Sequence, residues 1–237
     1  MPQHVLAVAH RGDPYRHREN TLPSVESALA AGADVVEVDV QLTRDGVPVL
    51  LHDLTLERLW DDPRPVGRVT LAELEQVGGP GLRVPTLAEA VKAVAERPGA
   101  RLLVDLDDPG PAAAAHAVVA GLGAEDLVGY CGPVGAMLAV RALDPAAELS
   151  LTWKLPRLPV PALLADVRPR YLNPPFGLVD AEYVAEAAGA GLAVSAWTAD
   201  RRRTMTRLLR AGVASVTSNR IALLRRVLDS TGRRGRA

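Results

Sequence analysis

Acidic residues alternate with apolar ones in two short runs of the chain. Glu37 and Asp39 are two apart in VVEVDVQ, and Asp105 and Asp107 are two apart in LLVDLD. Side chains two apart on a strand point to the same face, so each pair predicts two carboxylates on one face. Such a convergence calls for a cation, because like charges at close range do not all stay ionised. Oxygen ligands indicate Mg²⁺, Ca²⁺ or Mn²⁺ rather than Zn²⁺, and salt bridges to arginines at a rim are the alternative.

Two histidines each end an apolar run, His10 in VLAVAH and His52 in VPVLLH. A single histidine in such a place is commonly a hydrogen-bonded structural residue. Two of them fit phosphodiester cleavage, which requires one group to activate a nucleophile and another to protonate the leaving alkoxide. Arg11 follows His10 and adds a planar cationic donor that suits a phosphate oxygen. The residues alone indicate metal-assisted phosphoryl or acyl chemistry.

The elements that must position these residues follow a regular rhythm of β-branched runs and Ala- and Leu-rich helical stretches. This rhythm is typical of βαβ units. Strands are expected at 5–10, 33–41, 100–106, 126–132, 148–153, 170–174, 192–197 and 214–218. Helices are expected near 23–31, 86–95, 111–121, 133–142, 159–166, 180–189, 200–211 and 219–228. Eight units predict an α/β protein with a (β/α)8 TIM barrel, whose reactive groups lie at the carboxyl ends of its strands.

The second connection from strand to helix is unusually long. It begins with a further strand-like run at 46–53 and continues as a short insertion at about 54–85. The whole chain, 1–237, has the length of one barrel, so a single TIM-barrel domain is expected. Its basic end, about 229–237, is expected to be a flexible tail without a function of its own.

Composition excludes several classes of protein and partner. The 27 Lys and Arg nearly balance the 28 Asp and Glu, so we expect neither a nucleic-acid partner nor stable association with a membrane. The single cysteine, Cys131, excludes an intrachain disulfide framework and is expected to be a small core residue. The first residues lack the pattern of a secretory signal and no long apolar run occurs, so a cytoplasmic location is expected.

The order of motifs in residues 10–59 resembles the N-terminal signature of the glycerophosphodiester phosphodiesterase family. The motifs are HRG, ENT, GAD-x-x-E-x-D, T-x-DG-x-P-V and HD, in that order. Weaker similarities at 70–77, 84–91, 196–200 and 212–219 extend the resemblance over most of the chain. The resemblance implies a (β/α)8 barrel with a small insertion after the second strand. It also implies hydrolysis of a small-molecule glycerophosphodiester to an alcohol and glycerol phosphate.

The resemblance assigns roles to several of these residues. His10 and His52 match the family's general acid and base pair, and Arg11 matches its phosphate contact. Trp197 matches an aromatic residue that lines the substrate pocket. Near the last strand the chain departs from the family, because Thr217-Ser218-Asn219 stands where Thr-Asp is usual.

The resemblance also implies a divalent metal, Mg²⁺, Ca²⁺ or Mn²⁺, bound by Glu37, Asp39 and Asp105. On the third strand, however, Asp107 occupies the place of a lysine that binds phosphate in the family. The site then needs another cation to offset its negative charge. Lys154, expected at the carboxyl end of the fifth strand, is the candidate for that phosphate contact, and a solvated lysine at the rim is the alternative.

Two other functions fit parts of the sequence. The first is a phospholipase D-like or C-like hydrolase of lysophospholipids, which needs an apolar surface for an acyl chain. With 3% aromatic residues and one Phe, the sequence shows no obvious belt of that kind. The second is a non-catalytic barrel that binds phosphodiesters. The presence of both histidines and all three carboxylates argues against this second function.

Overall fold

The computed structural model describes residues 5–79 and 81–234. Eight parallel strands form a closed ring, in the order β1, β9, β8, β7, β6, β5, β4, β2, and the pairing of β1 with β2 completes it. The ring consists of β1 (Leu6–Ala9), β2 (Val35–Leu42), β4 (Arg101–Asp105), β5 (Val128–Gly132), β6 (Glu148–Thr152), β7 (Tyr171–Asn173), β8 (Ala193–Ala196) and β9 (Ser215–Ser218). The eight strands expected from the sequence are therefore all present.

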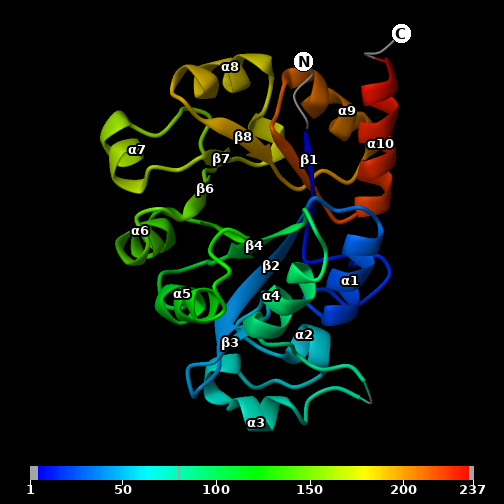
Figure 1. Ribbon diagram of the computed structural model, residues 1–237, viewed down its shortest axis with the longest axis vertical. Coiled ribbons are helices and arrows are strands. Elements are labelled where there is room, and N and C mark those ends of the chain that lie inside the picture. Colours follow the sequence, from blue (N-terminus) through cyan, green and yellow to red (C-terminus); the bar gives the residue numbers. More distant parts are fainter. Residues whose placement is uncertain (1–4, 80, 235–237) are drawn as a thin grey trace.

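Helices connect the strands and lie around the outside of the ring (Figure 1). They are α1 (Leu22–Ala30), α4 (Leu87–Ala95), α5 (Ala112–Gly121), α6 (Val134–Leu143), α7 (Pro161–Val167), α8 (Ala181–Gly189), α9 (Arg202–Ala211) and α10 (Ile221–Arg234). Local sequence explains several of their ends. Thr86 and Glu89 form a reciprocal capping box at the start of α4, and Gly212, with a φ of 89°, ends α9. This is the predicted (β/α)8 TIM barrel.

The alternation along β2 divides its side chains between the helices and the interior of the ring. Val36, Val38 and Val40 are buried in the main hydrophobic cluster, which also contains residues of α1 and α4. Glu37 and Asp39 therefore occupy the opposite face of the strand. In the register of β2 with β4, Asp39 pairs with Asp105, so the two acidic strands meet at the same level of the barrel.

The long second connection carries its own small elements, β3 (Pro48–Leu50), α2 (Glu57–Trp60), η1 (Val66–Arg68) and α3 (Leu71–Leu74). Strand β3 pairs antiparallel with β2, and a separate cluster of buried apolar residues, including Leu56 and Trp60, packs beneath these elements. They lie together at one end of the molecule (Figure 1). This is the predicted short insertion after the second strand.

The chain's end differs from its prediction. Helix α10 continues to Arg234, beyond the helix end expected near residue 228, and the flexibility of the tail stays a prediction. Residues 235–237 lie outside the described part. Across the residues that the structure describes, none of the helices is both long and apolar enough to cross a bilayer.

Candidate active site

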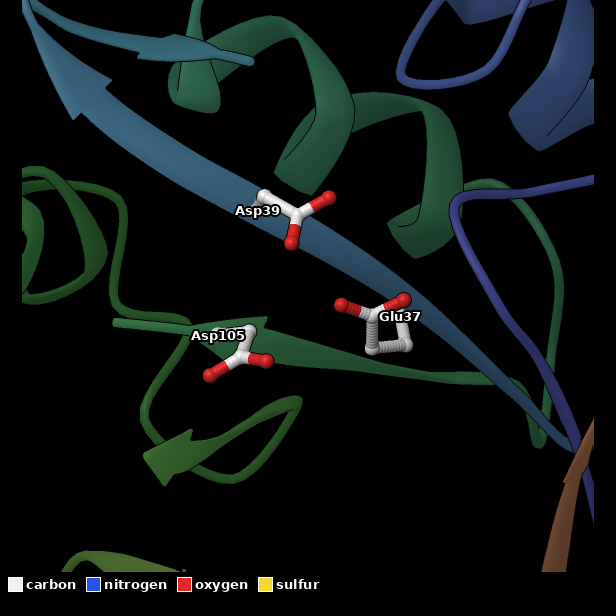
Figure 2. Close-up of side chains that lie close together, drawn as sticks. All are labelled: Glu37, Asp39 and Asp105. Atoms are coloured by element: carbon white, nitrogen blue, oxygen red, sulfur yellow. The ribbon is translucent and has the colours of Figure 1, made fainter. Parts of the chain in front are cut away.

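The acidic residues singled out in the sequence meet inside the barrel. Glu37 and Asp39 extend from β2 toward Asp105 on β4 (Figure 2). Each offers a carboxylate oxygen, and these oxygens all lie within 4.8 Å of one another. Glu37 and Asp39 are buried, and Asp105 is partly buried. The structure thus brings the three predicted metal ligands together.

Without a cation, the buried carboxylates of this cluster repel one another, and their charged forms are disfavoured. Burial, reinforced by the charges of Asp39 and Asp107, raises the pKa of Asp105 to about 7. Burial, reinforced by Asp39 and Asp105, raises the pKa of Glu37 well above its usual range. Carboxyl groups in such surroundings keep their protons unless an opposite charge compensates them.

The unpaired oxygen of Glu37 tests whether these residues fit a metal ion. Glu37 Oε2 accepts a hydrogen bond of 2.8 Å from the backbone N–H of Arg11. Glu37 Oε1 is buried and finds no hydrogen-bond partner among the described residues. A buried oxygen of this kind is costly unless something satisfies it, and a hard divalent cation does so. The residues therefore fit a metal held by Glu37, Asp39 and Asp105.

Arg11 lies beside this cluster in the turn that follows β1. Its Nε is 3.0 Å from Asp39 Oδ2, and its Nη1 donates to Glu19 Oε1 at 2.9 Å. Asn20, also in this turn, donates from Nδ2 to Asp39 Oδ2 at 2.7 Å. The ENT motif thus contributes two residues, Glu19 and Asn20, that hold the arginine and a carboxylate of the cluster in place.

His10 directly follows β1 and is held by a residue that directly follows the neighbouring strand β9. Its Nδ1 is 2.7 Å from Asn219 Oδ1, and Asn219 Nδ2 donates to Asp200 Oδ2 at 2.8 Å. The second bond fixes the orientation of the amide, so Nδ1 of His10 is the donor and its Nε2 is left for other contacts. Burial, followed by the charge of Arg11, lowers the pKa of His10 and favours the neutral imidazole.

His52 lies just beyond β3 and is held by its neighbour. Its Nδ1 is 2.7 Å from Asp53 Oδ1, and Gln41 Nε2 donates to its backbone carbonyl at 3.3 Å. Both histidines therefore have an oxygen acceptor at Nδ1. The same arrangement orients histidines in catalytic sites, where the partner fixes the tautomer.

A single cavity of about 600 Å³ joins these groups at the carboxyl end of the barrel. Its lining contains every site residue predicted from the sequence: His10, Arg11, Glu37, Asp39, His52, Asp105, Lys154 and Trp197. Asp107 lines the cavity as well. The cavity has the position in which barrel enzymes carry their reactive groups.

Lys154 and Trp197 lie together on the wall of this cavity. Lys154 Nζ is 5.7 Å from the centroid of the Trp197 ring, within the range of a cation–π contact. Trp197 Nε1 donates to the backbone carbonyl of Asn173 at 2.8 Å, which fixes the plane of the ring. The wall thus presents an aromatic face with a cation above it.

Four residues of the site escaped the sequence prediction. Asn219 holds His10 and is itself held by Asp200, although the sequence indicates only a departure from the usual Thr-Asp at 217–219. Cys131 is buried, as expected, but it also lines the cavity, and its thiol donates to Asp105. Asn173 has a buried Oδ1 without a hydrogen-bond partner in the described part of the chain. No local pattern marks these residues, because each acts through a neighbour distant in the sequence.

The fold and the site define a barrel enzyme that gathers carboxylates, histidines and an arginine in one cavity. The model of the glycerophosphoryl diester phosphodiesterase family matches residues 10–223, and the chain belongs to this family. It is 26% identical over 230 residues to a glycerophosphodiester phosphodiesterase of Caldanaerobacter subterraneus subsp. tengcongensis, with 90% of this chain and 93% of that one covered. A Bacillus subtilis glycerophosphodiester phosphodiesterase is 25% identical over 249 residues, with 92% and 84% covered.

Solved structures agree with the sequence comparisons. A phosphodiesterase of Oleispira antarctica, in complex with the product sn-glycerol-3-phosphate, has a TM-score of 0.88 and 26% sequence identity to this chain. The match covers 94% of this chain and 96% of that one. The expected family and fold are confirmed, and the chain is a phosphodiesterase.

Proposed function

We propose that the chain hydrolyses glycerophosphodiesters to an alcohol and glycerol phosphate with the help of a divalent metal. The observation that carries the proposal is the buried, unpaired Glu37 Oε1, in a cluster of three carboxylates that lines the same cavity as both histidines. The product in the similar Oleispira structure, sn-glycerol-3-phosphate, supports the choice of substrate.

The two histidines carry the proton transfers in this proposal. Each is bonded at Nδ1, His10 to Asn219 and His52 to Asp53, so each turns Nε2 to the reaction. One takes the proton of a glycerol hydroxyl that attacks the phosphorus, and the other gives a proton to the oxygen of the leaving alcohol. Water then opens the resulting cyclic phosphate to glycerol phosphate. The substrate must lie between them, within hydrogen-bond reach of both.

Glu37, Asp39 and Asp105 would hold Mg²⁺, Ca²⁺ or Mn²⁺. Such an ion supplies positive charge beside a phosphoryl oxygen as negative charge develops there. Arg11, which its two acidic neighbours hold next to the cluster, binds a second phosphoryl oxygen in this proposal.

Lys154 supplies a further cation at the phosphate in place of the family's third-strand lysine, and Trp197 forms the wall against which the substrate lies. The support is their shared position in the cavity that also holds the carboxylates of Asp105 and Asp107. A flexible ammonium group suits a contact made from a neighbouring wall.

Replacement of Lys154 by methionine tests this role. Lys154→Met should lower kcat/KM at least about tenfold, or roughly 1.4 kcal/mol of transition-state stabilisation. Lys92, the other lysine of the chain, is exposed on α4 outside the cavity, so Lys92→Met is the matched control. Asp107→Lys should partly restore activity to Lys154→Met. An unchanged kcat/KM in Lys154→Met would contradict a phosphate contact from Lys154. Arg11 and the metal would then be the cations that bind the phosphate.

A second candidate function has one specific observation in its favour. Leu155, which lines the cavity, is 56% exposed, and Pro133, Val134 and Trp153 line the same cavity. Such an apolar wall could receive the acyl chain of a lysophospholipid, whose cleavage uses the same reactive groups. The substrate with the higher kcat/KM, a lysophospholipid or a glycerophosphodiester without an acyl chain, decides between the two functions.

The function is tested by the release of glycerol phosphate from a panel of glycerophosphodiesters, with Mg²⁺, Ca²⁺ and Mn²⁺ added singly. Activity should appear with at least one metal and disappear in excess chelator. Full activity in excess chelator would contradict the requirement for a metal. Binding of every substrate without turnover would indicate a non-catalytic barrel.

A further inference from the structure

Helix α2 of the insertion places a single arginine between two parts of the active site. Arg58 Nη2 is 2.7 Å from Glu19 Oε1, in the turn after β1. Arg58 Nε is 2.5 Å from Asp53 Oδ2, in the loop after β3. One guanidinium group therefore bridges two carboxylates that are far apart in the sequence.

Each of these carboxylates also binds a residue of the reaction. Glu19 Oε1, the oxygen that accepts from Arg58, accepts from Arg11 Nη1 at 2.9 Å. Asp53, through its other oxygen, is 2.7 Å from His52 Nδ1. A continuous series of charged contacts thus runs from Arg11, beside the carboxylate cluster, through Arg58 to His52.

The two carboxylates and the guanidinium groups of this series stay charged near neutral pH. The bond from Arg58 is the main reason that the pKa of Asp53 is lowered to about 2. Burial acts to raise the pKa of Glu19, but the bonds and charges of Arg58 and Arg11 outweigh it and lower that pKa. A guanidinium group does not deprotonate, and its planar fork can hold two carboxylates in a fixed relation, which an ammonium group cannot.

We propose that Arg58 is a positioning residue for phosphodiester cleavage. By binding Asp53 and Glu19 together, it holds the imidazole of His52 in the orientation that the reaction requires. It also sets the distance between His52 and the turn that carries His10 and Arg11. The insertion thereby contributes to catalysis without touching the substrate. This inference rests on the role of His52 in the proposed function.

A role in stability alone does not account for this arrangement. The Arg58 side chain is 46% exposed, and exposed ion pairs contribute about 0–1 kcal/mol to folding. Its loss should therefore leave the fold intact. Displacement of a catalytic group by about 1 Å, in contrast, can lower turnover about 100-fold.

The experiment compares Arg58→Met with Arg64→Met in the full-length, metal-loaded enzyme. Arg64 lies in the same insertion, 47% exposed, and is paired with Asp62, so it is a matched control outside the series. Arg58→Met should lower kcat about tenfold or more, with KM changed less than about threefold, while Arg64→Met keeps wild-type values. In a His52→Ala background, Arg58→Met should have no further effect on kcat, because the group that it positions is gone.

A second measurement does not depend on activity. Imidazole ¹⁵N chemical shifts report the tautomer, and the signals of His52 are identified by their loss in His52→Gln. Wild type and Arg64→Met should show His52 locked with its proton on Nδ1, facing Asp53. Arg58→Met should show a mixture of tautomers. If Arg58→Met does not fold, Arg58→Lys, which keeps the charge but not the fork, takes its place and should lie between wild type and the methionine variant.

Unchanged kcat, or an unchanged His52 tautomer in the variant, would overturn the proposal. A raised KM at unchanged kcat would overturn it too, because Arg58 would then bind substrate directly. If wild type hydrolyses no glycerophosphodiester, the proposed function fails. The tautomer still shows in that case whether Arg58 orients His52.

Discussion

The two histidines of the cavity differ in the residue that orients them. His10 is bonded at Nδ1 to an amide oxygen, and His52 is bonded at Nδ1 to a carboxylate. The partly buried His10 favours its neutral form, because burial and then the charge of Arg11 lower its pKa. Two histidines in unlike surroundings suit a reaction in which one takes a proton and the other gives one.

Removal of either imidazole should therefore slow the reaction greatly. His10→Ala and His52→Ala should each lower kcat about 10²–10⁴-fold and leave the fold intact. The double variant should resemble the slower single variant, because the two groups act as one unit. Steady-state kinetics together with circular dichroism measures both effects. Near-wild-type turnover in either single variant would show that histidine to be structural.

At the scale of elements, the turn between β1 and α1 determines where Arg11 lies. Gly12 has a φ of 83°, and a Cβ placed on it would lie 2.4 Å from Ser24 Oγ and 2.6 Å from the Ser24 backbone carbon. Arg11 itself has a φ of 57°. The glycine of the HRG motif thus lets the chain pass close to α1 and turn the arginine toward Asp39.

A side chain at this glycine should disturb the turn and the site together. Gly12→Ala should lower kcat/KM by at least about tenfold and reduce the free energy of unfolding by about 1–3 kcal/mol, because the backbone must shift away from Ser24. Urea denaturation and kinetics measure the two quantities. Gly46, with a φ of 79° and open space around its Cβ position, makes Gly46→Ala the control: strain there should cost stability but not activity. Equal losses of activity in both variants would contradict this role of the turn.

At the scale of the whole molecule, the carboxylate cluster links stability to pH and metal. The pKa of Asp105 is about 7 in the fold against 3.8 as its ordinary value. Between these values the folded protein binds more protons than the unfolded chain, so this group's stabilising contribution is complete at low pH and is lost as pH rises through about 7. A bound cation offers the ionised carboxylate a new partner and removes the loss.

The rise in Tm on addition of Mg²⁺ should therefore grow between about pH 5 and about pH 7.5. Thermal scans with and without metal measure it. The lowered pKa of His10 acts with the opposite sign, but it is present in both scans and largely cancels in their difference. Glu37→Gln should show a much smaller rise at every pH. A rise that is equal at both pH values would argue against the coupling of metal binding to deprotonation of Asp105.

The sequence alone predicts much of this protein. Alternation in VVEVDVQ places Glu37 and Asp39 on one face, and the regular succession of strands and helices predicts the barrel that gathers their strand ends. Both inferences use local periodicity, which is visible in any short window of the chain. The motif order then indicates the family and the histidine pair.

Only the tertiary structure decided which residues support those groups. Asn219 reaches His10 across 209 positions, because β9 pairs with β1 where the ring closes. Arg58 reaches Glu19 across 39 positions, because the insertion folds back over the turn after β1. Such contacts depend on how distant elements pack, and no local pattern of hydrophobicity or charge specifies a partner at that distance. The reacting groups can thus be predicted from the sequence, whereas their orientation is a property of the closed barrel.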